Sequence, residues 1–179
     1  MRSSNTGLSH GTSGSPQENI ESLEYGAKVQ EIEAKLKEKL GQQEYSMEAL
    51  SNLGNIEHFT EGAIKHIFEG ELNNRGDAKG YHYEGIENTV GTLVPGTRTA
   101  PNPNGVYRGN VKVSGVSKIG FSTFFPREWS PQQVINSINQ AYETKKHLSG
   151  NRYYGYANGV KIEMFISSNG KIISAFPKE

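Results

Sequence analysis

Two histidines, His66 and His82, stand sixteen residues apart on either side of a polar segment broken by glycines. Histidine is the side chain whose unperturbed pKa lies nearest to neutrality, so it can both donate and accept a proton near pH 7. A lysine further along, Lys118 or Lys112, could add positive charge. These residue types match RNA cleavage by the 2′-hydroxyl, which needs a base, an acid for the leaving 5′-oxygen and a cation for the phosphorane.

Other interpretations of the same residues remain open. A lone histidine or lysine is more often an ordinary surface residue. Acidic residues follow His66 closely, but no second histidine stands at the three- or four-residue spacing of helical zinc motifs, so no bound metal or other cofactor is expected. The G-x-S-x-G elbow of serine hydrolases and the glycine motifs of nucleotide-binding enzymes are missing, which argues against both classes.

Composition sets further bounds. The chain has 179 residues, of which 34% are hydrophobic, and no cysteine, so disulfides, thiolate zinc sites and a cysteine nucleophile are excluded. No apolar run approaches the ~18 residues of a membrane span, and no membrane insertion is expected. Residues 1–59 hold five Lys/Arg and nine Asp/Glu, a net −4, whereas residues 60–179 hold fourteen and ten, a net +4. The carboxy-terminal part therefore suits a polyanionic ligand.

The positions of apolar and turn-forming residues divide the chain into three parts. Residues 1–17 are rich in Ser and Gly and predict a disordered lead or linker. Residues 18–54 predict linker or packing helices, the first of them running from a Ser15–Glu18 capping box to Gly41. One apolar stripe follows that helix: Tyr25, Val29, Ile32, Leu36 and Leu40. Residues 55–179 then form the domain that would carry the chemistry.

Within the later part, helices precede strands. Residues 46–68 predict one or two helices, with Ser46 and Thr60 as caps. Two strands follow around residues 106–113 and 119–125, and a helix should begin at Ser130-Pro131 and end near His147. Asn158-Gly159 and Asn169-Gly170 predict the turns of a closing three-stranded meander. This order indicates an α+β fold in which helices are followed by an antiparallel sheet that packs against them.

Three segments carry a resemblance to a known family. HIFEGE followed by GYHYEG, then SKIGFSTFFP, then KIISAFP stand in this order in the chain. Together they resemble the bacterial EndoU endoribonucleases, relatives of the uridylate-specific endoribonuclease of coronaviruses and of animal poly(U)-specific endoribonucleases. The resemblance covers about residues 55–179 and implies the EndoU fold, which is related to barnase. It favours Lys118 over Lys112, because the small hydroxyl residue and aromatic pair typical of the family follow Lys118.

The resemblance also implies roles for the residues of these motifs. His82 would be the general base, His66 the general acid, and Lys118 would stabilise the phosphorane. The Gly80 N–H could bind a phosphate oxygen, while Ser122 and Ser174 would contact the base or its sugar. Phe176 stands at a position where many relatives carry tyrosine, and it would stack on the base. The products would be a 2′,3′-cyclic phosphate and a 5′-hydroxyl, formed without metal at uridine-containing single-stranded or tRNA-loop sites.

Partners follow from the same resemblance. The substrate would be RNA, with tRNA as one candidate, and not DNA. Bacterial EndoU domains commonly end larger secreted or contact-delivered toxins, act in the cytoplasm of the target cell, and are neutralised by a cognate immunity protein. The alternative from another functional class is a catalytically inactive RNA- or partner-binding module on the same fold.

Overall fold

The computed structural model describes residues 21–32 and 44–179. Residues 21–32 are helical, with the side chains of Tyr25 and Ile32 exposed. The expected capping box, the residues Leu36 and Leu40 of the apolar stripe and the expected lead 1–17 lie outside the described residues. In the described part of the chain no helix has the length and apolar character needed to cross a bilayer.

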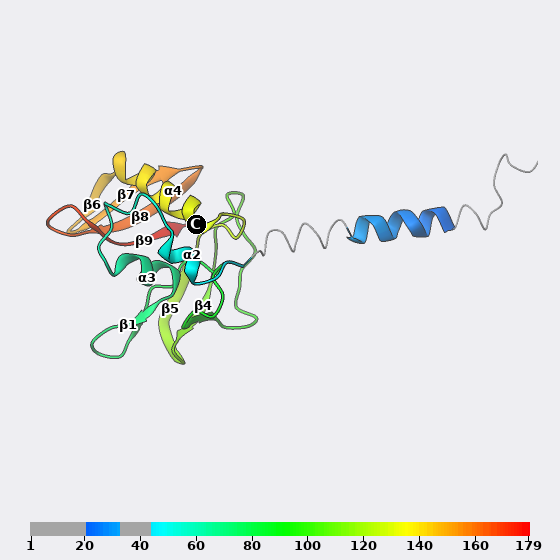
Figure 1. The fold of residues 1–179 in the computed structure, drawn as a ribbon, viewed down its shortest axis with the longest axis horizontal. Coiled ribbons are helices and arrows are strands. Elements are labelled where there is room, and N and C mark those ends of the chain that lie inside the picture. Colours follow the sequence, from blue (N-terminus) through cyan, green and yellow to red (C-terminus); the bar gives the residue numbers. More distant parts are fainter. Residues whose placement is uncertain (1–20, 33–43) are drawn as a thin grey trace, which may run out of the picture. The chain divides into compact units, whose positions relative to one another are not determined.

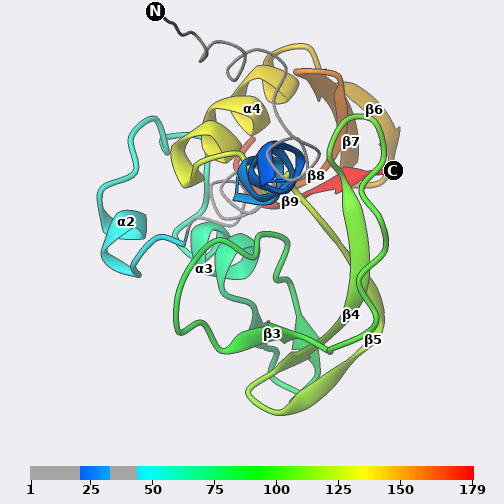
Figure 2. The same ribbon diagram turned by 90° about the vertical axis from the view of Figure 1, so that its right-hand side faces the viewer.

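Residues 44–179 belong to one compact unit (Figure 1). Its helices are α2 (Glu48–Ser51), α3 (Ala63–Phe68) and α4 (Pro131–Glu143). Its strands form three antiparallel sheets: β1 (Glu71–Leu72) with β2 (Ala78–Lys79); β3 (Gly91–Leu93), β4 (Tyr107–Val113) and β5 (Val116–Phe124); and β6 (Lys146–Ser149), β7 (Arg152–Ala157), β8 (Val160–Ile166) and β9 (Ile172–Lys178). The predicted α+β class is confirmed. Figure 2 shows α4 against the last sheet and the long β4–β5 pair leading away from it.

Some predicted boundaries are wrong. The helix that begins at Ser130 ends at Glu143, and His147 lies in β6, so the final sheet has four strands rather than three. β6 is an exposed edge strand rich in polar residues, and its sequence looks like a basic last helical turn. Neither Ser46 nor Thr60 is an N-cap; α2 and α3 begin after Met47 and Gly62, without a side-chain cap. Ser130 does cap α4, accepting a hydrogen bond from the Gln133 N–H.

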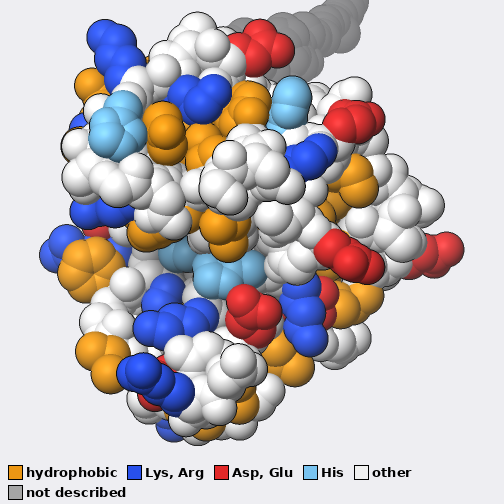
Figure 3. All heavy atoms as spheres, turned by 90° about the vertical axis from the view of Figure 1, so that its left-hand side faces the viewer, with side chains coloured by type: hydrophobic (Ala, Val, Ile, Leu, Met, Phe, Trp, Pro, Cys, Tyr) orange, Lys and Arg blue, Asp and Glu red, His pale blue; other side chains and the backbone are white. Residues whose placement is uncertain are grey.

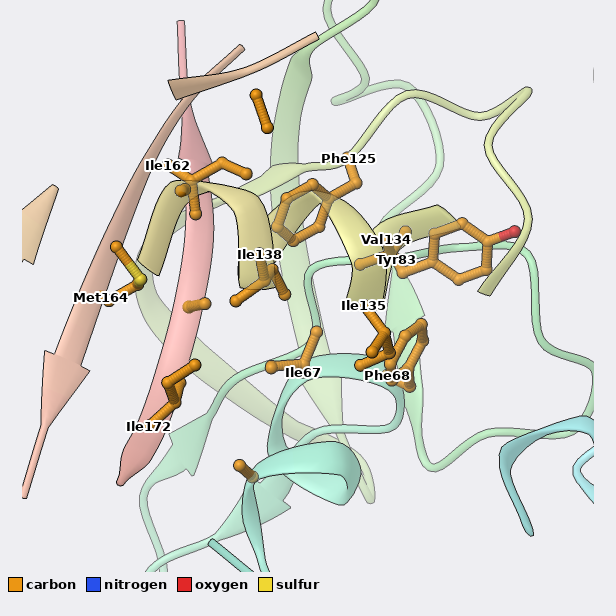
Figure 4. Close-up of a cluster of buried hydrophobic side chains, with 14 of the residues drawn as sticks. Ile67, Phe68, Tyr83, Phe125, Val134, Ile135, Ile138, Ile162, Met164 and Ile172 are labelled. Atoms are coloured by element: carbon orange, nitrogen blue, oxygen red, sulfur yellow. The ribbon is translucent and has the colours of Figure 1, made fainter. Parts of the chain in front are cut away.

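Two hydrophobic cores lie side by side in this unit. The larger one packs α3 and α4 against β8 and β9 (Figure 4), while the smaller one lies under β4 and β5. Neighbouring residues go to different cores: Tyr81 enters the smaller and Tyr83 the larger, and the same holds for Phe124 and Phe125. His82, between the two tyrosines, is therefore held at the junction of the cores.

A β-bulge interrupts β5 beside this junction. Ser117 pairs with Lys112 and Phe121 with Asn110, so residues 118–120 lie opposite the single residue Val111. Gly120 allows the bulge because its φ of +77° is in the left-handed region. A bulge changes the direction of the side chains it contains, and this one contains Lys118.

Candidate active site

His66 occupies the last turn of α3 and is tied to the start of β1. Its Nδ1 lies 3.0 Å from Oε1 of Glu71. Because a carboxylate only accepts hydrogen bonds, Nδ1 carries the proton in this contact. The other ring nitrogen, Nε2, is the one left for a substrate, and the Glu71 carboxylate fixes the orientation of the ring.

His82 is buried and tied to the backbone of β5. Its Nδ1 lies 2.8 Å from the carbonyl oxygen of Thr123, and its own carbonyl accepts the N–H of Phe125 at 2.9 Å. Nδ1 must therefore be protonated, which leaves the lone pair on Nε2. Burial, followed by the nearby Lys118 charge, holds the pKa of His82 well below its usual value of 6.5. The ring is thus neutral near pH 7, as a general base must be.

Lys118 leaves the bulge and joins a triangle of hydrogen bonds. Its Nζ donates to Ser122 Oγ at 2.7 Å and to the Gly80 carbonyl at 3.0 Å, and the Ser122 hydroxyl donates to the same carbonyl at 3.2 Å. Burial, followed by the charge of Lys79, lowers the pKa of Lys118 to about 8. Ser122 is fully buried beneath the lysine. It is placed to position Lys118, and its expected contact with base or sugar stays a prediction.

Gly80 joins the segments that carry these groups. Its φ is +78°, and a Cβ there would lie 2.1 Å from the His66 carbonyl oxygen. The same carbonyl accepts the N–H of Tyr81 at 2.8 Å. Only glycine fits at this position, where the chain passes between α3 and the Lys118 side chain.

His66, His82, Lys118 and Gly80 line one cavity of about 460 Å³, and Ser174 and Phe176 of β9 line it as well. The two imidazole centroids are 6.3 Å apart. The Phe176 ring stacks on His82, with centroids 5.4 Å apart and planes inclined by 28°. Figure 3 shows histidine side chains in the hollow, with basic side chains gathered along its edge. The geometry thus brings the expected residues together, while their roles stay predictions.

The charge of the cavity favours an anion. Lys79, Lys118 and Lys178 line it, and no Asp or Glu is among its described lining residues. Lys112, the alternative to Lys118, borders a neighbouring hollow instead. Among the residues that the structure describes, no cluster of three His, Asp or Glu side chains could hold a metal ion.

Sequence reasoning missed several contributors. Glu71 entered it only as a member of an acidic cluster and Thr123 only as part of the SKIGFSTFFP motif, while nothing singled out Asn151 or Phe165. Thr123 acts through its backbone carbonyl, which any residue type could supply, so no sequence signal exists for it. For Glu71 the only signal was an acidic residue shortly after a histidine. That pattern is too common in sequences to identify a partner of His66.

Comparison with known proteins identifies the family to which this chain belongs. The family model described as "Bacterial EndoU nuclease" matches residues 60–179, which include every group above. The chain belongs to this family. A protein from Bacillus cereus named "Toxin" is 49% identical to this EndoU chain over 136 residues, which cover 74% of the chain and 25% of that protein. The chain therefore spans about a quarter of the length of this relative. No solved structure matched this EndoU chain.

Proposed function

We propose that this EndoU domain is an endoribonuclease that uses the 2′-hydroxyl of its substrate as nucleophile and needs no metal ion. The observation that carries the proposal is that two imidazoles and a buried lysine line one cavity. Each imidazole has Nδ1 tied to an oxygen and Nε2 left over. An acid–base pair and a cation are the groups that transphosphorylation requires.

In the proposed reaction, Nε2 of His82 takes the proton of the 2′-hydroxyl, and the resulting oxyanion attacks the adjacent phosphorus. His66, in its imidazolium form with protons on both ring nitrogens, donates the Nε2 proton to the departing 5′-oxygen and keeps the Nδ1 proton that faces Glu71. The P–O5′ bond breaks, leaving a 2′,3′-cyclic phosphate and a 5′-hydroxyl. The Lys118 ammonium, mostly protonated at pH 7 with a pKa of about 8, stabilises the charge on the phosphorane.

The nucleoside that supplies the 2′-hydroxyl is proposed to be uridine in single-stranded or tRNA-loop RNA, with its base beside Ser174 and Phe176. Ser174 lies in β9 next to the aromatic ring that holds His82. On this proposal the base would bind next to the general base. RNA recognition of this type relies on unpaired bases that can leave the stack, which suits an open hollow of this size.

We further propose that the domain acts as the nuclease part of a delivered toxin, in the cytoplasm of a target cell, and is neutralised by an immunity protein. Support comes from the relative named "Toxin", of which this chain matches 25%.

The direct test compares His66→Ala and His82→Ala with His147→Ala, an exposed histidine of β6. Each purified protein is incubated with RNA in the presence of a chelator, and the fragment ends are mapped. We expect cyclic-phosphate ends with the wild type and with His147→Ala, and a loss of at least about a thousandfold in the other two variants. Near-normal cleavage by a folded His82→Ala protein would overturn the mechanism. RNA binding without cleavage by the wild type would favour a binding module.

A further inference from the structure

A second hollow adjoins the candidate active site. It has a volume of about 420 Å³ and lies along β4 and β5 at the bulge. Lys118 and Phe121 border both hollows, so the two are continuous along β5. Lys118, the group proposed to bind the scissile phosphate, and Phe121 thus both lie where the two hollows meet, while Phe176 borders only the first.

Phe121 is an exposed aromatic ring beside this junction. Its exposed fraction is 52%, and the Arg108 guanidinium carbon lies 4.6 Å from the ring centroid. Arginine and an aromatic ring together form the type of platform on which nucleic-acid bases stack. The ring lies in β5 directly before the Ser122 that holds Lys118, so its position relative to the lysine is fixed by the strand.

The remaining lining of the second hollow suits a phosphodiester. Lys112 and Lys118 supply positive charge, Asn110 and Ser117 supply neutral polar groups, and no Asp or Glu borders it among the described residues. Such a composition fits a sugar–phosphate chain better than an apolar partner.

We infer that this second hollow binds the nucleotide that follows the cleaved bond, with its base stacked on Phe121 and its 3′-phosphate near Lys112. The inference rests on the proposed function, because the RNA must cross Lys118 to place its scissile phosphate there. With the attacking nucleoside beside His82 and Phe176, the next nucleotide leaves on the opposite side of Lys118. This subsite binds any base by stacking and adds affinity without selecting sequence.

The experiment uses short RNAs with one uridine, followed either by a normal nucleotide or by an abasic one. For each protein, kcat/KM is measured on both RNAs, and the ratio reports the contribution of the following base. We expect the wild type to prefer the normal RNA by about tenfold, a typical effect of one stacked base. In Phe121→Ala the ratio should fall to near one. The matched control is Ile119→Ala, a neighbour that is 90% exposed and borders neither hollow.

Three outcomes would overturn this subsite: a wild-type ratio near one, a Phe121→Ala variant that keeps the wild-type ratio, or an Ile119→Ala variant that loses it. If Phe121→Ala lowers kcat/KM equally on both RNAs, the ratio is unchanged, and this result also counts against the subsite. Failure of the proposed function gives a different result, since the wild type would then cleave neither RNA.

Discussion

The two walls of the cavity are held in place by different forces. The β9 wall, formed by Ser174 and Phe176, is backed by the larger core, in which α4 buries one whole face. The β5 wall, formed by Lys118 with Ser122 beneath it, is backed by the smaller core and by the hydrogen bonds that converge on the Gly80 carbonyl. Apolar packing is spread over many contacts, whereas the polar triangle depends on three groups. The β5 wall should therefore be the more sensitive to single substitutions.

Gly80→Ala should have the largest effect, because Gly80 contacts both the His66 carbonyl and the Lys118 side chain. The new Cβ would collide with the His66 carbonyl at 2.1 Å, displacing either His66 or the Lys118 acceptor. We expect at least about a hundredfold loss of RNA cleavage. Gly76→Ala is the matched control: Gly76 has a similar φ of +83°, but a Cβ there meets nothing within 4 Å. Equal activity of the two variants would contradict the role of this close contact.

Lys118→Arg tests whether the charge on the β5 wall limits activity at high pH. Loss of the proton from a histidine acid lowers log kcat/KM by about one per pH unit, and loss of the Lys118 charge adds about one more. The wild-type slope should therefore steepen above about pH 8, where Lys118 titrates. Arginine keeps its charge, so the variant should be slower at its optimum yet lack the second slope. A wild-type slope that stays constant up to pH 10 would exclude this assignment.

Ser122→Ala and Ser174→Ala should separate the walls by kinetics. Without its hydroxyl partner Lys118 is held less well, so Ser122→Ala should lower kcat about tenfold and change KM little. Ser174→Ala removes a group from the proposed base-binding side, so it should mainly raise KM for uridine-containing RNA. If both variants change the same kinetic parameter, the assignment of kcat to the β5 wall and of KM to the β9 wall is wrong.

Glu71→Gln should have a smaller effect on the same reaction. The amide can still orient His66 but is a weaker partner for its Nδ1–H than a carboxylate, so we expect kcat to fall about fivefold with KM unchanged. Glu69→Gln is the control, two residues earlier in the chain and outside the cavity lining. Comparable losses in the two variants would show that charge near the site, and not the contact to His66, is responsible.

His82→Gln should change how the free energy of unfolding depends on pH, without changing the fold. The folded pKa of His82 is lowered, so below pH 6.5 the unfolded chain binds a proton that the folded chain does not. The wild-type free energy of unfolding should then fall with decreasing pH, this histidine contributing at most about 1.4 kcal/mol per pH unit. Urea unfolding between pH 7.5 and 5 should show a shallower dependence for His82→Gln, and an unchanged one for His147→Gln. Parallel curves for the wild type and His82→Gln would contradict the burial of a neutral ring.

The sequence predicted much of the local structure on the β9 side of the molecule. Asn158-Gly159 forms a hairpin turn with positive φ at both residues, and Ser130 caps α4, as their local patterns predicted. Such signals act within a few residues, so a sequence displays them directly. The strand β6 was not predicted. An exposed edge strand is stabilised by pairing with its neighbour, here β7, and not by an apolar pattern of its own.

The amino-acid sequence by itself determined the class of fold and which side chains were available for chemistry: two histidines, a choice of lysines, and a motif order that resembles one family. Tertiary structure decided how they are arranged. The bulge in β5 directs Lys118 to Gly80, Glu71 and the Thr123 carbonyl set the histidine tautomers, and Ser122 lies under the lysine instead of facing the cavity. These outcomes depend on pairings up to 42 residues apart in the chain, and no local pattern encodes a distance between such segments.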